Sequence, residues 1–171
     1  MENGVQLADS NGEGELVITN EEIRFNGKSK CGHRKDEEVT IPWPATPKSG
    51  DIANNWKEDP KAGHWFAGVL LEKRTCDGDC SYESVNFRRN TSKEEFKQAN
   101  ERGLLFGCCK TAFRPYDLAV QCLLVIARYH LGKDIEVSSD GEKENWAEAV
   151  TLCQEMLGYG LMFELEEVRI K

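Results

Sequence analysis

The sequence has no long apolar segment and no excess of positive charge. No apolar run approaches the ~18 residues that span a bilayer, and residues 1–20 contain no basic stretch followed by an apolar one, so we expect neither a membrane segment nor a secretory signal. Lys and Arg number 22 against 30 Asp and Glu, a formal net charge of −8. Direct nucleic-acid binding is not expected, because it requires an excess of Lys and Arg.

The sequence also lacks the short motifs that mark common catalytic sites. It contains no Gly-rich phosphate loop, no nucleophile elbow and no His-Glu-x-x-His. The cysteines are odd in number, which without a secretory signal argues against a disulfide framework. We therefore expect a cytoplasmic protein with reduced thiols. The seven cysteines are Cys31, Cys76, Cys80, Cys108, Cys109, Cys122 and Cys153.

The chain has 171 residues, of which 39% are apolar and 30% charged. A chain of this size can bury a hydrophobic core, and we expect a single domain that spans residues 1–171. Residues 1–13 are rich in Asn, Gly, Asp and Glu, and we expect them to be disordered. Residues 42–63 hold four of the five prolines and predict a long loop. Trp56 lies in this loop, and because its large apolar side chain favours burial, we expect the loop to be at least partly ordered.

The N-terminal half is predicted to be rich in antiparallel strands. Residues 15–19, 23–27 and 39–43 have the apolar patterns of short strands, and the second of these ends in Asn-Gly, a strong turn signal. Residues 64–75 and 82–90 are predicted to form the two arms of a hairpin that turns at residues 76–80.

The C-terminal half is predicted to be mainly helical. Ser92 and Glu95 have the spacing of a capping box at a helix start. Two longer apolar-periodic segments predict further helices, and the two or three C-terminal helices packed on the N-terminal sheet make the fold class α+β. The helices are expected at 92–103, 115–131 and 142–157, a buried strand or tight connection at 104–109, and strands at 135–138 and 161–168.

Two short cysteine patterns suggest a metal site. Cys31-x-His33 and Cys76-x-x-x-Cys80 together supply three thiols and one imidazole, and zinc takes about four such ligands. The predicted hairpin would place its two cysteines at the turn, and the N-terminal sheet would supply the other pair. Neither spacing is usual for zinc, and a hairpin tip with an unrelated cysteine is the plainer alternative.

A second cysteine pair suggests thiol chemistry. Cys108 and Cys109 precede the helix expected at 115–131, and a helix start or nearby cations such as Lys110 and Arg114 can lower a cysteine pKa. His64 or His130 would then act as the base. The alternative is a buried segment in which the cysteines are small apolar residues.

The last third of the chain carries a strong acidic bias. Residues 134–167 contain ten acidic residues and one basic residue, Lys143, which is a charge of −9. Such a face repels nucleic acid and attracts basic proteins, although a solvated helix surface explains the pattern equally simply. Trp56, which Trp43 and Trp65 flank, is a further candidate anchor for a partner. The acidic candidates are Glu142, Glu144, Glu148 and Glu155.

Two functions fit these observations. The leading hypothesis is a non-enzymatic protein-binding module without a cofactor, which would use its acidic C-terminal face. One version is a phage or mobile-element inhibitor that evades host defence by blocking a basic, nucleic-acid-acting enzyme. The alternative is a small zinc-stabilised or cysteine-dependent enzyme, with zinc at Cys31, His33, Cys76 and Cys80.

Overall fold

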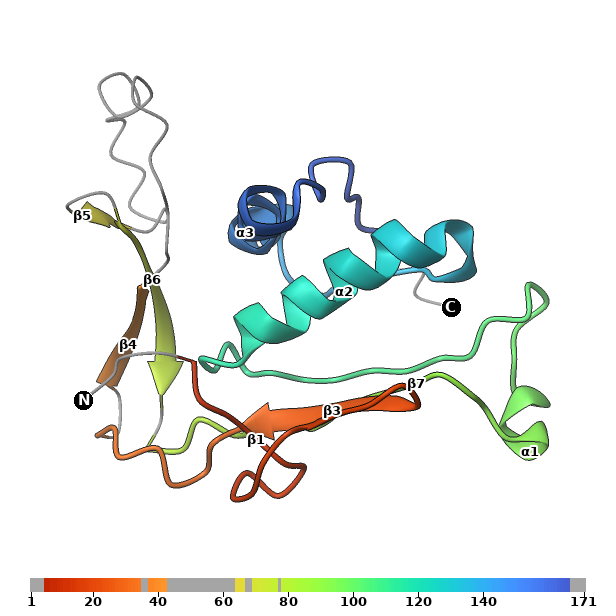
Figure 1. Ribbon diagram of the computed structural model, residues 1–171, viewed down its shortest axis with the longest axis horizontal. Helices are drawn as coiled ribbons and strands as arrows, with labels where there is room; N and C mark the ends of the chain where they lie inside the picture. The colour runs from red at the N-terminus through yellow and green to blue at the C-terminus, as the bar shows by residue number, and fades with distance from the viewer. Residues whose placement is uncertain (1–4, 35–36, 43–63, 67–68, 77, 167–171) are drawn as a thin grey trace.

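The computed structural model describes residues 5–34, 37–42, 64–66, 69–76 and 78–166 (Figure 1). The loop expected at 42–63, with Trp43 and Trp56, lies outside these residues apart from Pro42. Trp65 is described only through its backbone. No helix in the described part of the chain has the length and apolar character needed to cross a bilayer.

The first sheet is built around β3 (Glu22–Gly27). Strands β1 (Leu7–Ala8), β2 (Val17–Ile18) and β7 (Val85–Arg88) all pair antiparallel with it. Leu7 and Ala8 belong to the segment expected to be disordered, and pairing with the end of β3 orders them instead. The side chain of Asp9 then accepts hydrogen bonds from two backbone N–H groups of the turn that follows.

The second sheet has the order β4-β6-β5 and is antiparallel. It consists of β4 (Glu37–Pro42), β5 (His64–Phe66) and β6 (Val69–Cys76), with Glu37 opposite Cys76. The predicted hairpin between residues 64–75 and 82–90 is therefore wrong. Strand β6 pairs within its own sheet, and the chain then crosses to the first sheet, where β7 pairs with β3.

The helical half contains α1 (Lys93–Phe96), α2 (Asp117–Leu131) and α3 (Ala147–Leu157), with 3-10 turns at Gly132–Asp134 and Lys143–Trp146. The longer two helices confirm the α+β prediction. The helix expected at 92–103 has only four residues and buries none of them. Without an apolar face to pack, a helix this short gains little beyond its cap.

Three predicted helix caps are confirmed, whereas α2 begins two residues later than expected and α3 begins at Ala147 after a 3-10 turn. Ser92 and Glu95 form the capping box, with the Ser92 hydroxyl accepting from the Glu95 N–H and the Glu95 carboxylate accepting from the Ser92 N–H. Gly158 ends α3 in the left-handed region at a φ of 78°, where glycine avoids the strain a side chain would cause. Gly132 follows α2, also at positive φ.

Helix α2 lies between the first sheet and α3 and supplies both halves of the core (Figure 1). Towards the sheet, Val120 packs with Tyr116, which directly precedes the helix, and with Phe25 and Val85 from β3 and β7. Towards α3, a second cluster closes the interface between the helices. Its buried members are Leu118, Val125, Val137, Trp146, Ala149 and Cys153.

Two expected strands, at 135–138 and in the described part of 161–168, are not formed, and the segment 104–109, expected as a buried strand or a tight connection, is a connection that is not buried. Residues 104–109 run as an exposed connection between α1 and α2, and Phe106 is 90% exposed. Residues 135–138 and the described part of 161–168 approach each other, but the N–H of Glu166 donating to the Val137 carbonyl at 2.8 Å does not make a ladder. Their alternating patterns reflect packing on α2 and α3 rather than a sheet.

Candidate metal centre

Four ligand-type side chains converge at the junction of the two sheets. The Sγ atoms of Cys31 and Cys76 lie 3.4 Å apart, and those of Cys76 and Cys80 lie 3.3 Å apart. The Nδ1 atom of His33 lies 3.3 Å from the Sγ of Cys80. The four ligand atoms all lie within 4.8 Å of one another. The structure thus brings together all four residues predicted from the sequence.

These separations fit a single tetrahedral ion. Thiolates at ~2.3 Å and an imidazole nitrogen at ~2.0 Å from zinc lie about 3.5–3.8 Å from each other. The closest pairs of ligand atoms, at 3.3–3.4 Å, are slightly tighter than this. No pair exceeds 4.8 Å, so shifts of up to about 1 Å would bring all four ligand atoms to the distances of one bound ion. A disulfide needs about 2.05 Å between sulfurs, and the three thiols are free.

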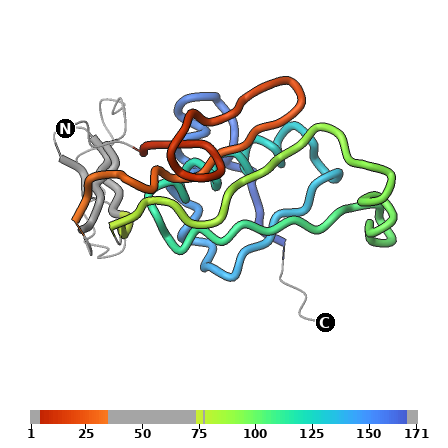
Figure 2. The backbone as a smooth tube through the Cα atoms, turned by 90° about the horizontal axis from the view of Figure 1, so that it is seen from below, coloured from red at the N-terminus to blue at the C-terminus, as the bar shows by residue number. Residues whose placement is uncertain are grey.

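The ligands sit on the two crossings between the sheets. Residues 28–34 follow β3 and carry Cys31 and His33. Cys76 is the last residue of β6, and Cys80 lies in residues 78–84, which precede β7. The two crossings run side by side (Figure 2), and the N–H of Cys80 donates to the Lys28 carbonyl at 3.2 Å. An ion at this position would clamp both connections at once.

Backbone groups of the two turns also point at the sulfurs. Gly32 and Gly78, the residues after Cys31 and two after Cys76, have positive φ values of 83° and 76°. Burial acts to raise the pKa of the Cys31 thiol, but hydrogen bonds from the backbone of His33 and from neighbouring thiols outweigh it and lower that pKa. Donors directed at a sulfur stabilise the thiolate, which is the form that binds metal.

The other two thiols are deeply buried. Cys76 is fully buried and Cys80 is 3% exposed, and burial raises the pKa of both thiols. A buried cluster of three thiols is unfavourable for more than one negative charge unless a cation is present. A divalent ion would remove this obstacle, because a coordinated thiol is deprotonated outright.

Asn26 and Gly27, whose pattern predicts a turn, instead hold this junction in place. The side chain of Asn26 donates to the Tyr82 carbonyl at 2.9 Å and accepts from the Tyr82 N–H at 3.0 Å, as a neighbouring strand would. A Cβ at Gly27 would lie 1.9 Å from the Cys80 carbonyl oxygen and 3.0 Å from the Tyr116 ring. Asn26 and Gly27 therefore do not form a turn; they contact residues 80–82 of the segment between β6 and β7.

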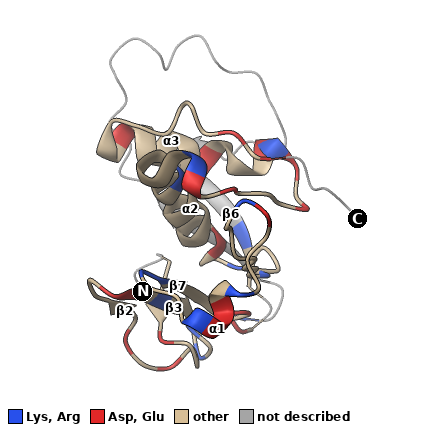
Figure 3. Cartoon of the chain, turned by 90° about the vertical axis from the view of Figure 1, so that its right-hand side faces the viewer, with Lys and Arg blue, Asp and Glu red and all other residues tan. Residues whose placement is uncertain are grey.

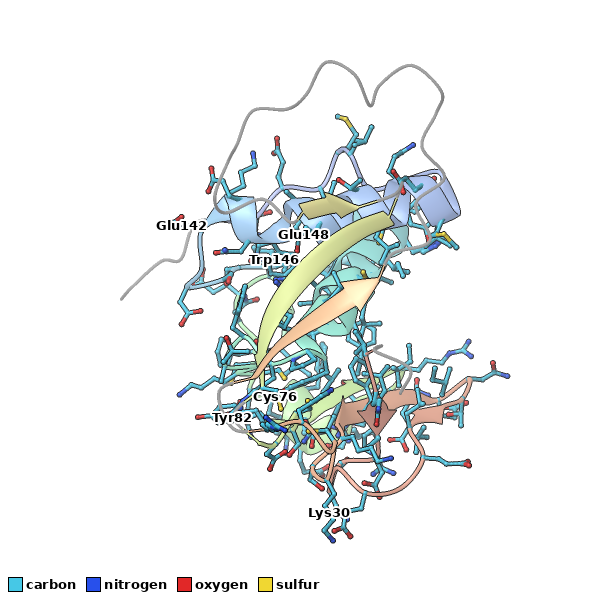
Figure 4. All side chains as sticks on the ribbon, turned by 90° about the vertical axis from the view of Figure 1, so that its left-hand side faces the viewer. Lys30, Cys76, Tyr82, Glu142, Trp146 and Glu148 are labelled. Atoms are coloured by element: carbon cyan, nitrogen blue, oxygen red, sulfur yellow. The ribbon has the colours of Figure 1, made fainter. Side chains whose placement is uncertain are left out.

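The four acidic candidates do not form one free surface. Glu142, Glu144 and Glu155 are exposed, and the Glu142 carboxylate also accepts from the backbone N–H of Asn145 in a capping box. Glu148 is half-buried and ion-pairs with Arg74 at 3.6 Å. Figure 4 shows Glu142, Trp146 and Glu148 at the helical end of the molecule, away from Cys76. Trp56 lies outside the described residues.

Arg74 joins the second sheet to both long helices. It is 3% exposed and lies 3.5 Å from Asp117, the first residue of α2, in addition to Glu148 in the first turn of α3. Thr111 and Gln121 donate to the two oxygens of Asp117 at 2.6 and 3.0 Å. Burial lowers the pKa of Arg74 and raises that of Glu148, and the ion pair opposes both shifts.

Of the second cysteine pair, Cys109 does not have the properties of a nucleophile. Burial raises the pKa of Cys109 to about 11, and its thiol donates to the Glu83 carbonyl at 3.3 Å. The lowered pKa expected from the sequence is therefore wrong for Cys109. His130 lies at the far end of α2, with its Nε2 3.4 Å from the Tyr159 hydroxyl.

Among the described residues, the cluster of Cys31, His33, Cys76 and Cys80 has a geometry that could hold a metal ion. Comparisons of the chain with protein-family models, with curated proteins and with solved structures found no match.

Proposed function

We propose that this chain is a non-enzymatic protein-binding module whose two sheets are held together by one zinc ion bound to Cys31, His33, Cys76 and Cys80. The convergence of three thiols and one imidazole on the two crossings carries the metal part of this proposal. Four protein ligands fill a tetrahedral site, which is the pattern of structural rather than catalytic zinc.

The ligand set favours zinc over other common ions. Calcium and magnesium prefer carboxylate, carbonyl and water oxygens, and the four ligand atoms here are sulfur and nitrogen. Thiolates and imidazole in a tetrahedral arrangement suit zinc.

Metal analysis of the purified protein tests the metal part. We expect about one equivalent of zinc per chain, and a tetrahedral thiolate spectrum after exchange with cobalt(II). Cys80→Ser should lose the metal, whereas Cys108→Ser, which changes an exposed cysteine outside the cluster, should keep it. Metal-free protein that fails to take up zinc under reducing conditions would contradict the proposal.

The acidic bias of residues 134–167 supports the binding part. Asp and Glu are coloured red in Figure 3, which shows them in the helical layer as well as in the sheet layer. Clustered negative charge attracts basic proteins and speeds their association. We propose a basic partner, in the specific version a nucleic-acid-acting defence enzyme that a phage or mobile-element inhibitor would block. The exposed acidic residues of this region include Asp134, Glu136, Asp140, Glu142, Glu144, Glu155, Glu164 and Glu166.

Affinity capture from a lysate at low and moderate salt, with mass spectrometry, tests the binding part. The double variant Glu144→Lys/Glu155→Lys should retain less partner than the wild type, because both residues are exposed. Glu148 is left unchanged, since its reversal would place a cation against buried Arg74. The matched control Glu15→Lys/Glu101→Lys changes the net charge equally at two other exposed sites. Equal losses in both variants would refute a specific acidic face.

A further inference from the structure

An apolar groove lies between α3 and the chain that follows it. It has a volume of about 380 Å³ and runs along the start of α3 and residues 161–165. Trp146 and Phe163 both line it; Trp146 is 6% exposed, and the two rings stack with centroids 5.2 Å apart. Val150 and Leu165 complete the apolar lining.

Two large apolar side chains that line the groove are exposed to solvent. Leu161 is 68% exposed and Met162 is 93% exposed. Exposed apolar side chains beside a concave apolar surface mark an interaction site more often than scattered ones do. Methionine is unbranched and adaptable, which suits a surface that packs against side chains of a partner.

The rim of the groove is mainly acidic. Glu144 and Glu164 line it together with one base, Lys143. The surrounding residues 134–167 carry a charge of −9. An apolar groove within a negative surface is complementary to a basic amphipathic helix, whose apolar face enters the groove while its Lys and Arg residues meet the carboxylates.

We propose that this groove binds a basic amphipathic helix of the partner protein. The inference deepens the proposed protein-binding function and rests on it. A second copy of this chain is a poorer occupant, because it would bring another surface of −9 against the first and like charges across an interface are unfavourable.

Titration with a synthetic probe tests the groove directly. The probe is an amphipathic peptide of Leu and Lys, about 18 residues or five helical turns long, and its control is a scrambled peptide of the same composition. Binding to the full, zinc-loaded chain is measured by calorimetry and by the fluorescence of its tryptophans. We expect the amphipathic peptide to bind and the scrambled one to bind at least about tenfold more weakly, a difference of ~1.4 kcal/mol.

Matched variants locate the binding. Met162→Asp should weaken peptide binding at least about tenfold, and Phe106→Asp, which alters an equally exposed apolar residue outside the groove, should leave it unchanged. Both positions are exposed, so both variants should fold, and unchanged zinc content checks this. Affinity should also fall with salt because the rim is charged.

The outcomes separate this inference from the function it rests on. Equal binding by wild type and Met162→Asp, with loss in Glu144→Lys/Glu155→Lys, would overturn the groove but leave an acidic binding face. Absence of peptide binding to the full chain would overturn the groove, as would a dimer that Met162→Asp dissociates. Failure to capture any partner from lysate, or failure to bind zinc, would instead count against the proposed function.

Discussion

Removal of the metal is expected to lower the free energy of unfolding by about 4 kcal/mol. Cys31 and Cys76 are 45 positions apart, and an ion that joins them closes a loop of that length in the unfolded chain. The chain-entropy relation for a cross-link gives about 13 cal/mol/K for such a loop, which is ~4 kcal/mol at 25 °C. Cys80 adds little to this loop term, because it follows Cys76 by only four positions.

Thermal unfolding under reducing conditions measures this effect. For a chain of this size, about 1 kcal/mol corresponds to ~2–4 °C in Tm, so the zinc-loaded protein should melt on the order of 10 °C above the metal-stripped form. Cys80→Ser should melt like the stripped protein and should not respond to a chelator. Cys108→Ser should behave like the wild type, because that exposed thiol is outside the cluster.

A Tm that does not change on metal removal would refute this reasoning. The two crossings would then be held by hydrogen bonds alone, such as the one from the Cys80 N–H to the Lys28 carbonyl and those of the Asn26 side chain. A stripped protein that melts normally but still binds zinc tightly would show that the unfolded chain binds the ion equally well, since only preferential binding to the folded state stabilises it.

Three further predictions concern the scaffold. Gly27→Ala should destabilise the protein by about 1–3 kcal/mol in urea unfolding and weaken zinc binding, because the added Cβ would lie 1.9 Å from the Cys80 carbonyl oxygen. The control Gly107→Ala, whose Cβ would have no atom within 4 Å, should change stability little. Equal effects of the two variants would contradict the packing argument. Arg74→Met should cost about 3–5 kcal/mol in the same assay, since it leaves two buried or half-buried carboxylates without their cation, and a loss below ~1 kcal/mol would show that those carboxylates are solvated. Glu95 has its pKa lowered to about 2, first by the Ser92 N–H, so its contribution is present above pH 4.5 and disappears as the pH falls towards 2. Glu95→Gln should flatten that part of the acid unfolding curve, and identical curves would contradict the assignment.

The ligand set could be predicted although the topology around it could not. The residue types identified Cys31, His33, Cys76 and Cys80, because few other side chains bind zinc. The expected hairpin, however, relied on sequence neighbours pairing with each other. The pairing of β7 with β3 joins residues about sixty positions apart, and it depends on Asn26 and Gly27, whose role needs the partner segment to be known.

Helix periodicity predicted α2 and α3 but not the surroundings of each polar residue. Glu148 has the position of a solvated acid on the polar face of α3, yet Arg74 from the second sheet approaches it and reduces its exposure. No local pattern in residues 142–157 contains that information. Patterns of alternation failed similarly at 135–138 and 161–166, because a strand also requires a partner strand.

The cluster of Cys31, His33, Cys76 and Cys80 and the helices are linked through the last residues of β6. Arg74 and Cys76 are two positions apart on the strand, so their side chains point to the same face, and both are buried while Thr75 between them is exposed. One of them reaches the metal cluster and the other reaches the first turns of α2 and α3. An ion bound to Cys76 would therefore also fix the position of Arg74 relative to the carboxylates of Asp117 and Glu148. Leu161 and Met162 have no such link, which is why changes there should alter partner binding without disturbing the metal.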